Sequence, residues 1–282
     1  MARNILWLGA HKTGTTFLQK SLDLSQDALA AGQVHYVELD AFRQMYTRPL
    51  VNGRTDLQVA ESVYRQDWAG TNLVFDENLP ALVQHVCRPE GLYTSGPARS
   101  RLLADHLGFE RPLIVFGIRA FASYLPSLYC ETLKSTPFKV FRKFLRTPLE
   151  HLAWYPAIKA LQGEFQGSEV LVYQYETLKG NERALLAHIT GLAPDGFTLL
   201  GQTERPGFSQ RSIHRLREIN KTRKVERKDV RDAVKAFPKG AENPAYWPWT
   251  PEENPRLAAL YAADVARIKT DDSLTFLDCN TL

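Results

Sequence analysis

The stretch Ile5-Leu-Trp-Leu-Gly9-Ala-His-Lys12-Thr-Gly14-Thr-Thr16 predicts a phosphate-binding turn between a strand and a helix. Its first four residues form a short apolar run typical of a buried strand. The glycine-bounded loop then leads into a segment of helical character with apolar Phe17, Leu18 and Leu22. N–H groups at the start of such a helix converge on an anion, and the helix dipole favours negative charge there.

The position of the lysine separates this loop from the loops that bind nucleoside triphosphates. Gly9 and Gly14 fit the G-x-x-x-x-G part of that motif, and Thr16 fits its Ser/Thr. The residue directly after the second glycine is Thr15, where the motif has lysine. The loop's lysine is Lys12 instead, so its positive charge reaches a bound phosphate from a different place.

The sequence Lys12-Thr-Gly-Thr-Thr16 after a strand resembles the 5′-phosphosulfate loop of sulfotransferases, which is commonly Pro-Lys-Ser-Gly-Thr-Thr. This family uses 3′-phosphoadenosine 5′-phosphosulfate (PAPS) as its donor. Thr13 replaces the serine and keeps its hydroxyl, whereas His11 replaces the proline and removes a rigid turn residue. The resemblance implies that the donor is bound by His11, Lys12, Thr13, Gly14, Thr15 and Thr16.

Two acids, Asp76 and Glu77, follow the apolar run Leu73-Val-Phe75. Ligands of open α/β sheets bind beyond the carboxyl ends of the strands, so these carboxylates are expected beside the glycine loop. In a nucleoside triphosphatase, Asp76 would hold Mg²⁺ through water. The resemblance to sulfotransferases implies instead that Glu77 takes the proton from the acceptor. A third interpretation is that the two acids cap the following segment.

A long apolar strand, Arg111-Pro-Leu-Ile-Val-Phe-Gly-Ile-Arg119, ends in an arginine and precedes a helical stretch with Ser127. A guanidinium at that junction can bind phosphate through two hydrogen bonds, and a hydroxyl can add another. Arg119 and Ser127 resemble the Arg-x₇-Ser pair of the 3′-phosphate site in sulfotransferases. Pro126, inside the helical stretch, predicts a kink or a late helix start.

Two weaker resemblances lie further along the chain. Tyr175-Glu-Thr-Leu-Lys179 resembles the Tyr-Glu-Asp-Leu-Lys stretch of cytosolic sulfotransferases, which implies that Tyr175 lies against the adenine. An ordinary buried strand tyrosine is the alternative. Arg205-Pro-Gly207 loosely resembles the Arg-Lys-Gly loop that closes over the 3′-phosphate, with proline in place of lysine, and implies that Arg205 binds there.

The composition is that of an ordinary globular enzyme, with 282 residues, 44% hydrophobic and 23% charged. No run approaches the ~18 apolar residues that predict a membrane span. The N-terminus leads directly into the first strand, which leaves no room for a signal peptide. Three widely spaced cysteines match no metal or disulfide pattern. These features favour a reducing, cytoplasmic setting.

A basic block lies between Arg205 and Lys239. It holds twelve Lys or Arg against four acids and so carries +8, whereas the whole chain carries +4. Such a block suits an anionic ligand, although it is also typical of a solvated helix face. Apolar residues recur along it at helical spacing, and Pro238-Lys-Gly240 ends the pattern. Because the block is amphipathic and embedded in the chain, it does not indicate a free arm for nucleic acid.

Alternating strand-like and helix-like segments predict an α/β fold, a single P-loop-type domain over 1–282 with a mostly parallel central sheet flanked by helices. Besides the elements above, the pattern predicts strands near 32–38, 169–175 and 274–277, and helices near 98–107 and 253–269. Three segments with little pattern are expected to border the acceptor site: 40–70, 131–160 and 240–252.

Together these features predict a PAPS-dependent sulfotransferase that acts on a hydroxyl or amine of a small-molecule or saccharide acceptor. In-line displacement would release adenosine 3′,5′-bisphosphate, with Lys12 on the leaving phosphate and Glu77 as general base. The scheme requires no metal. Two alternatives stay open, a P-loop kinase or triphosphatase using Mg-ATP and a non-catalytic polyanion-binding protein. The identity of the acceptor and the oligomeric state stay open as well.

Overall fold

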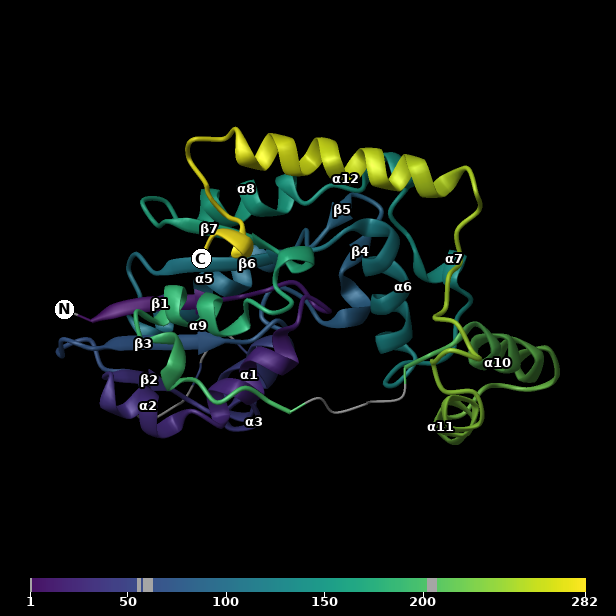
Figure 1. The fold of residues 1–282 in the computed structure, drawn as a ribbon, viewed down its shortest axis with the longest axis horizontal. Helices are drawn as coiled ribbons and strands as arrows, with labels where there is room; N and C mark the ends of the chain where they lie inside the picture. Colours follow the sequence, from purple (N-terminus) through teal and green to yellow (C-terminus); the bar gives the residue numbers. More distant parts are fainter. Residues whose placement is uncertain (1, 55–56, 58–62, 202–206) are drawn as a thin grey trace.

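A parallel sheet forms the centre of the molecule (Figure 1). The computed structural model describes residues 2–54, 57, 63–201 and 207–282. Within these residues the sheet has six strands in the order β2-β3-β1-β6-β7-β8, and each neighbouring pair is parallel. The strands are β1 (Arg3–Trp7), β2 (Val34–Tyr36), β3 (Thr71–Phe75), β6 (Leu113–Ile118), β7 (Val170–Gln174) and β8 (Thr275–Leu277). The predicted α/β fold with a mostly parallel sheet is confirmed.

Both faces of the sheet are buried, which explains the near-continuous apolar runs of its strands. Side chains alternate along β1, so that Leu6 joins the core on one face while Ile5 and Trp7 join the core on the other. Trp7 stacks on Phe75 of the neighbouring strand β3, with 4.3 Å between ring centroids. Apolar packing on two sides therefore fixes the strands that carry the site.

Helices cover each face. One core includes residues of α1 (Thr15–Asp23), α2 (Gln26–Ala31) and α9 (Glu182–Thr190). The other includes residues of α5 (Gly96–Leu107), α6 (Phe121–Thr132), α8 (Tyr155–Glu164) and α12 (Glu253–Lys269). The remaining elements are α3 (Leu39–Phe42), the π-helical turn η1 (Arg43–Thr47), α4 (Arg48–Val51), the pair β4 (Cys87–Arg88) and β5 (Gly91–Leu92), α7 (Phe141–Phe144), and the 3₁₀ turns η2 (Val83–His85), η3 (Leu149–His151), η4 (Tyr175–Thr177), η5 (Pro194–Gly196) and η6 (Cys279–Thr281).

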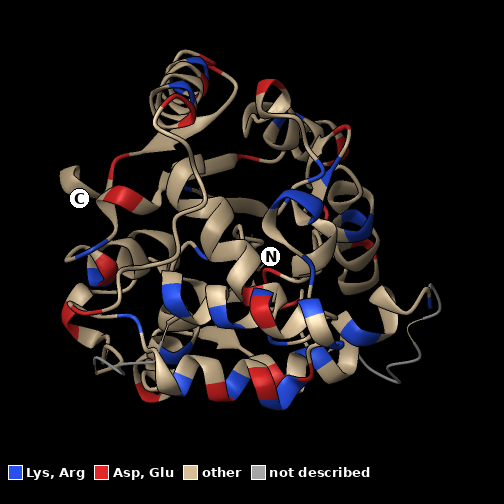
Figure 2. Ribbon diagram, turned by 90° about the vertical axis from the view of Figure 1, so that its right-hand side faces the viewer, with Lys and Arg blue, Asp and Glu red and all other residues tan. Residues whose placement is uncertain are grey.

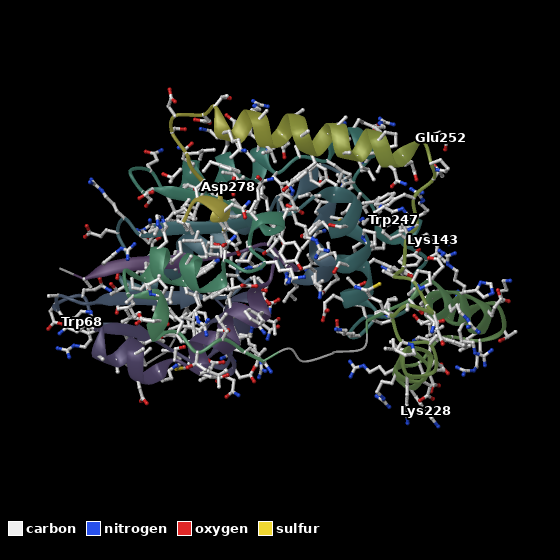
Figure 3. All side chains as sticks on the ribbon, in the orientation of Figure 1. Trp68, Lys143, Lys228, Trp247, Glu252 and Asp278 are labelled. Carbon is white, nitrogen blue, oxygen red and sulfur yellow. The ribbon has the colours of Figure 1, made fainter. Side chains whose placement is uncertain are left out.

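The basic block forms two helices, α10 (Gln210–Thr222) and α11 (Arg227–Ala236), which pack on each other away from the sheet (Figure 1). Ile213, Leu216 and Ala233 are buried between them and the body. Figure 2 views the side that carries this pair and shows its Lys and Arg residues interspersed with acids. Lys228 of α11 points away from the body (Figure 3). Much of the block is therefore an exposed helix face.

Pro126 does not delay the start of its helix, because α6 begins at Phe121. The expected late start is therefore wrong. Proline has no N–H and leaves the carbonyl four residues earlier without its helical donor. That carbonyl belongs to Ala122, and it accepts a hydrogen bond of 2.8 Å from Nε1 of Trp249. A tryptophan far along the chain thus satisfies the group that Pro126 frees.

Candidate functional site

The carboxyl ends of β1, β3, β6 and β7 lie at one edge of the sheet and lead into the segments that carry the predicted site residues. β1 sits between β3 and β6. The chain runs from β1 to strands on one side of it and from β6 to strands on the other. Ligands of open α/β sheets bind at such a switch point.

The loop after β1 turns through three left-handed backbone conformations, at Gly9 (φ 52°), Lys12 (φ 65°) and Gly14 (φ 85°). The left-handed φ of Gly14 favours glycine, and a Cβ there would lie 2.8 Å from Cδ2 of Leu178, which would have to shift. Gly14 is the N-cap of α1. Among the described residues, the N–H groups of Gly14, Thr15 and Thr16 have no hydrogen-bond acceptor. The helix start can therefore receive an anion.

The other loop side chains are used in different ways. The Thr13 hydroxyl is buried and donates to the carbonyl of Ala10 at 2.6 Å. Thr15 is buried as well, whereas Thr16 is exposed on the first turn of α1. His11 is 5% exposed, and its backbone N–H donates to the Tyr93 hydroxyl at 2.8 Å. Thr13 and His11 thus shape the loop from inside.

Arg119, directly after β6, is tied to the loop. Its Nη1 donates to the Lys12 carbonyl at 2.7 Å, and its Nε donates to the Ser123 hydroxyl at 2.9 Å. Its guanidinium lies 4.4 Å from the ring centroid of Tyr175, which follows β7. Glu176 accepts a hydrogen bond from the Ala120 N–H at 2.9 Å. This bond also links the segment after β7 to the segment after β6.

Lys12, Arg119 and Ser127 line one cavity of about 230 Å³. Ser123 and Ser127 are four residues apart on α6, so they lie on the same helix face. The rest of the lining is Pro126, Cys130, Glu131, Lys134, Gly207, Phe208, Lys239, Ala245, Tyr246 and Trp247. Among the described lining residues, four lysine or arginine side chains thus accompany one acid. The structure brings these three predicted residues together, although Lys12 lies 107 positions before Arg119 in the sequence.

The acid of this cavity is paired with two lysines. Nζ of Lys12 lies 3.0 Å from Oε2 of Glu131, and Nζ of Lys134 lies 2.9 Å from the same oxygen. Burial opposes ionisation of Glu131, but the two ammonium groups outweigh it and lower its pKa to about 2. Glu131 is therefore a carboxylate at any physiological pH.

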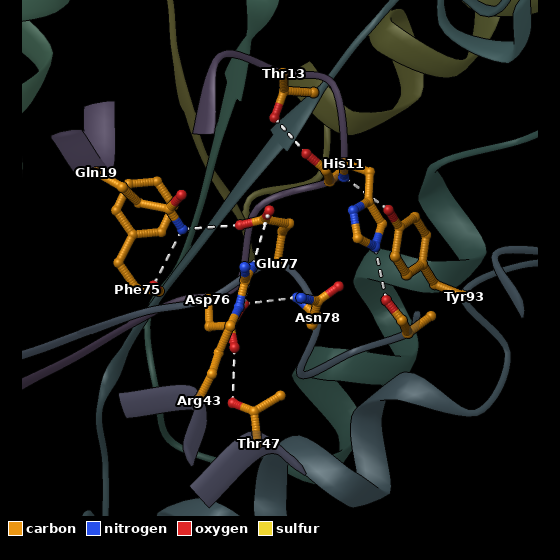
Figure 4. Close-up of polar contacts among 12 residues, drawn as sticks. His11, Thr13, Gln19, Arg43, Thr47, Phe75, Asp76, Glu77, Asn78 and Tyr93 are labelled. Carbon is orange, nitrogen blue, oxygen red and sulfur yellow. Dashed lines mark hydrogen bonds and ion pairs between the residues drawn. The ribbon is translucent and has the colours of Figure 1, made fainter. Parts of the chain in front are cut away.

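Asp76 and Glu77 belong to a buried network around Arg43 (Figure 4). Nε and Nη2 of Arg43 lie 3.0 and 2.7 Å from Oδ1 of Asp76, and Nη2 also lies 3.1 Å from Oε1 of Glu77. The Thr47 hydroxyl donates to Oδ2 of Asp76 at 2.7 Å. Arg43 and Thr47 lie at the two ends of η1. The network therefore fixes the excursion after β2 to the end of β3.

Glu77 lies next to the loop, because a Cβ on Gly9 would be 4.0 Å from the Cβ of Glu77. Its Oε2 accepts from Gln19 of α1 at 2.8 Å. Burial opposes its ionisation, but the charge interactions with His11 and Arg43 and the hydrogen bond from Gln19 outweigh burial and lower the pKa of Glu77. For Asp76 burial prevails, and its pKa is raised despite Arg43.

His11 faces the same acids. Burial lowers the pKa of His11, so the ring is uncharged near neutral pH. Its Nε2 lies 2.7 Å from the Ala81 carbonyl, which can only accept, so Nε2 carries the proton. Nδ1 is then the unprotonated nitrogen.

Several lining residues were not predicted from the sequence. Lys134, Lys239 and Trp247 reach the cavity from segments that have no recognisable motif. Trp247 lies on the connection that leads from α11 towards α12 (Figure 3). Arg205 lies outside the described residues, but Gly207 of the same tripeptide lines the cavity. Lys134 and Trp247 lie in the segments 131–160 and 240–252 that were expected to border the acceptor, and Lys239 ends the basic block, but no role had been predicted for these three residues.

Within the described residues, no group of three or more His, Cys, Asp or Glu side chains is placed to hold a metal ion. The described helices also include none that is long and apolar enough to cross a membrane.

No protein-family model matches the chain, and no curated protein matches it. Among solved structures, the chain is similar to the crystal structure of a sulfotransferase from Alicyclobacillus acidocaldarius. The identity is 12% and the TM-score is 0.40, over 94% of this chain and 96% of that chain. A likeness this distant leaves the function to be argued from the residues of the site itself.

Proposed function

We propose that the protein is a sulfotransferase that transfers a sulfuryl group from PAPS to a hydroxyl or amine acceptor. The observation that carries the proposal is the shared cavity of Lys12, Arg119 and Ser127 beside the loop of β1. A P-loop without the usual lysine after its second glycine suits a phosphosulfate better than a triphosphate. The arginine and serine of the same cavity suit a second phosphate.

The residues present fit an anionic donor. The described lining of the cavity has an excess of cations, Lys12 of the loop among them, and two serine hydroxyls. Its volume of about 230 Å³ is below the ~300 Å³ of the smallest ligand sites, so it suits a phosphate-bearing part of the nucleotide. Tyr175, stacked on Arg119, offers an aromatic surface next to it. We assign the 3′-phosphate to Arg119 and Ser127, and the adenine to Tyr175.

Lys12 and the N–H groups of Gly14, Thr15 and Thr16 would stabilise the charge that develops on the leaving 5′-phosphate. The acceptor oxygen or nitrogen attacks sulfur, and the bond from sulfur to the bridging phosphate oxygen breaks with its electron pair going to that oxygen. Glu77, ionised and beside the loop, takes the acceptor's proton. No step requires a metal.

Asp76 is less suited to either of its alternative roles. It is fully buried, and its two carboxylate oxygens are occupied by Arg43, Thr47 and the Asn78 N–H. Water-mediated binding of Mg²⁺, as in a kinase or triphosphatase, would have to displace this network. His11, with an unprotonated Nδ1, is the alternative base if Glu77 is dispensable.

The acceptor is expected against the three segments 40–70, 131–160 and 240–252. Each contributes a described residue to the site: Arg43 contacts Glu77, while Lys134 and Trp247 line the cavity. Cationic and aromatic side chains suit a hydroxylated acceptor, such as a saccharide or a small molecule.

A thermal-shift experiment tests the donor. Adenosine 3′,5′-bisphosphate should stabilise the protein without Mg²⁺, because ligands that bind only the folded state raise its stability. Stabilisation by ATP only with Mg²⁺ would favour a kinase. No effect of either nucleotide, together with salt-sensitive binding to heparin, would favour a polyanion-binding protein.

Two variants test the roles, with sulfuryl transfer from labelled PAPS to an acceptor panel as the assay. Lys12→Ala should abolish turnover and weaken binding of the bisphosphate. Glu77→Gln should abolish turnover but leave that binding unchanged, because a base acts on the acceptor. Full activity of Glu77→Gln would transfer the role to His11 or Asp76.

A further inference from the structure

Lys12 and Lys134 share a single carboxylate oxygen, Oε2 of Glu131, at 3.0 and 2.9 Å. Glu131 belongs to the last turn of α6 and lines the same cavity as Lys12 and Arg119. The side chains of Lys12 and Glu131 are each 32% exposed, so a ligand in the cavity can reach the pair. The lysine assigned to the leaving phosphate is thus already bound by a protein anion.

We propose that Glu131 is an exchange partner for Lys12. The lysine pairs either with Glu131 or with the 5′-phosphate of the nucleotide, while Lys134 stays on the carboxylate in both arrangements. Glu131 is then a positioning residue, since it acts through Lys12 and does not contact the reacting atoms. The inference rests on the proposed function, because it takes a nucleotide phosphate as the competing anion.

The charges around the cavity support the exchange. Glu131 remains ionised because Lys12 and Lys134 lower its pKa to about 2, although burial opposes them. If Lys12 leaves, Lys134 still lies 2.9 Å from Oε2, so the carboxylate is not left without a cation. The cost of moving Lys12 to a phosphate is therefore small. When the product leaves, Lys12 moves back from the phosphate to Glu131. Competition from Glu131 for Lys12 therefore favours release of the bisphosphate product.

Replacement of Glu131 by glutamine should therefore tighten binding of adenosine 3′,5′-bisphosphate. The carboxamide is similar in size but no longer competes for Lys12 or repels the anion. A partly exposed ion pair contributes up to ~1 kcal/mol, which corresponds to about fivefold in Kd. The dissociation rate of the bisphosphate, measured by stopped-flow displacement, should fall by a similar factor. Glu131→Asp, which keeps the charge, should stay close to the wild type.

A matched control removes the same charge elsewhere. Glu218 on α10 pairs with Lys221 three residues away at 2.8 Å, as Glu131 pairs with Lys134, but it does not line this cavity. Glu218→Gln should leave the Kd unchanged. Equal tightening in both variants would mean that only the net charge matters, and it would overturn the exchange.

A double-mutant cycle separates exchange from direct binding by Lys134. Lys134→Met should weaken binding of the bisphosphate about fivefold. Within the described structure Lys12 is then the sole partner of Glu131, so Glu131 competes more strongly with the phosphate for Lys12. In the Glu131→Gln background the same change should have little effect. An equal loss in both backgrounds would mean that Lys134 binds the phosphate directly and would overturn the exchange.

The outcomes also separate this inference from the proposed function. If the wild type binds the bisphosphate but Glu131→Gln binds it equally or more weakly while melting normally, the exchange alone is wrong. If neither protein binds it, the proposed function and the exchange are both wrong.

Discussion

Replacement of Arg43 by methionine tests whether the Arg43 network holds the acids of the site. Methionine keeps much of the apolar volume but removes the guanidinium that binds Asp76 at 2.7 and 3.0 Å and Glu77 at 3.1 Å. Asp76 is fully buried, so water cannot replace the lost partner. Among the described residues, only the Thr47 hydroxyl and the Asn78 N–H would still donate to this carboxylate.

Arg43→Met should lower the free energy of unfolding by a large amount. Removal of one partner from a buried ion pair destabilises a protein by about 3–5 kcal/mol, because the remaining charge is left in an apolar environment. For a chain of this size that loss lowers the melting temperature by about 10 °C. Asp76→Asn in the same protein should restore part of it, since the amide carries no charge.

The loss should depend on pH. Burial already raises the pKa of Asp76 in the folded protein, and removal of Arg43 raises it further. A carboxyl whose pKa is higher in the folded than in the unfolded state binds more protons when folded, so its contribution to stability is lost as pH rises. The deficit of Arg43→Met should therefore be smaller at pH 5 than at pH 8.

Urea unfolding at pH 5 and pH 8, monitored by circular dichroism, measures the difference in unfolding free energy between Arg43→Met and the wild type. Arg48→Met is the matched control, because Arg48 is exposed and makes no ion pair among the described residues. A deficit of under ~1 kcal/mol for Arg43→Met, or one independent of pH, would refute the reasoning.

Three further predictions concern the loop and the helix behind it. Gly14→Ala should lower the free energy of unfolding by about 1–2 kcal/mol, because φ is 85° and the new Cβ would contact Leu178. It should also weaken binding of the bisphosphate, measured by calorimetry, and an unchanged affinity would mean that the loop does not bind the anion. Trp249→Phe should lower the free energy of unfolding by about 1–3 kcal/mol, because the Ala122 carbonyl loses its donor; no loss in urea titration would mean that water replaces it. Arg119→Lys should weaken binding of the bisphosphate about tenfold or more and also lower the melting temperature of the free protein, because an ammonium cannot reproduce the guanidinium's bonds and ring contact; wild-type affinity would exclude Arg119 from the site.

The sequence predicted the strands and helices whose hydrophobic pattern is strong. The central strands, α10 to α12 and the edge strand β8 lie close to the predicted segments. Helix α9 and the β4–β5 pair were missed, because their short patterns do not stand out in one sequence. The segment after β2 also lacked a clear period, since it combines short α turns with the π-helical η1.

Within the candidate site, local sequence was informative where one short segment makes one structure. The strand, the glycine-bounded loop and the start of α1 follow from Ile5–Thr16 alone, since glycines and helix termini impose their geometry locally; the left-handed conformation of Lys12 was not predicted. The ends of β3 and β6 were also predictable, because each apolar run stops at a charged residue.

Only the tertiary structure decided which partners these residues have. The pairing of Lys12 with Glu131, of Asp76 with Arg43, and of Ala122 with Trp249 joins groups separated by 119, 33 and 127 positions. Such contacts depend on how helices and strands pack, and packing is set by the whole core and not by local pattern. The sequence by itself determined a glycine loop between a strand and a helix on a parallel sheet; the fold determined which charges surround that loop.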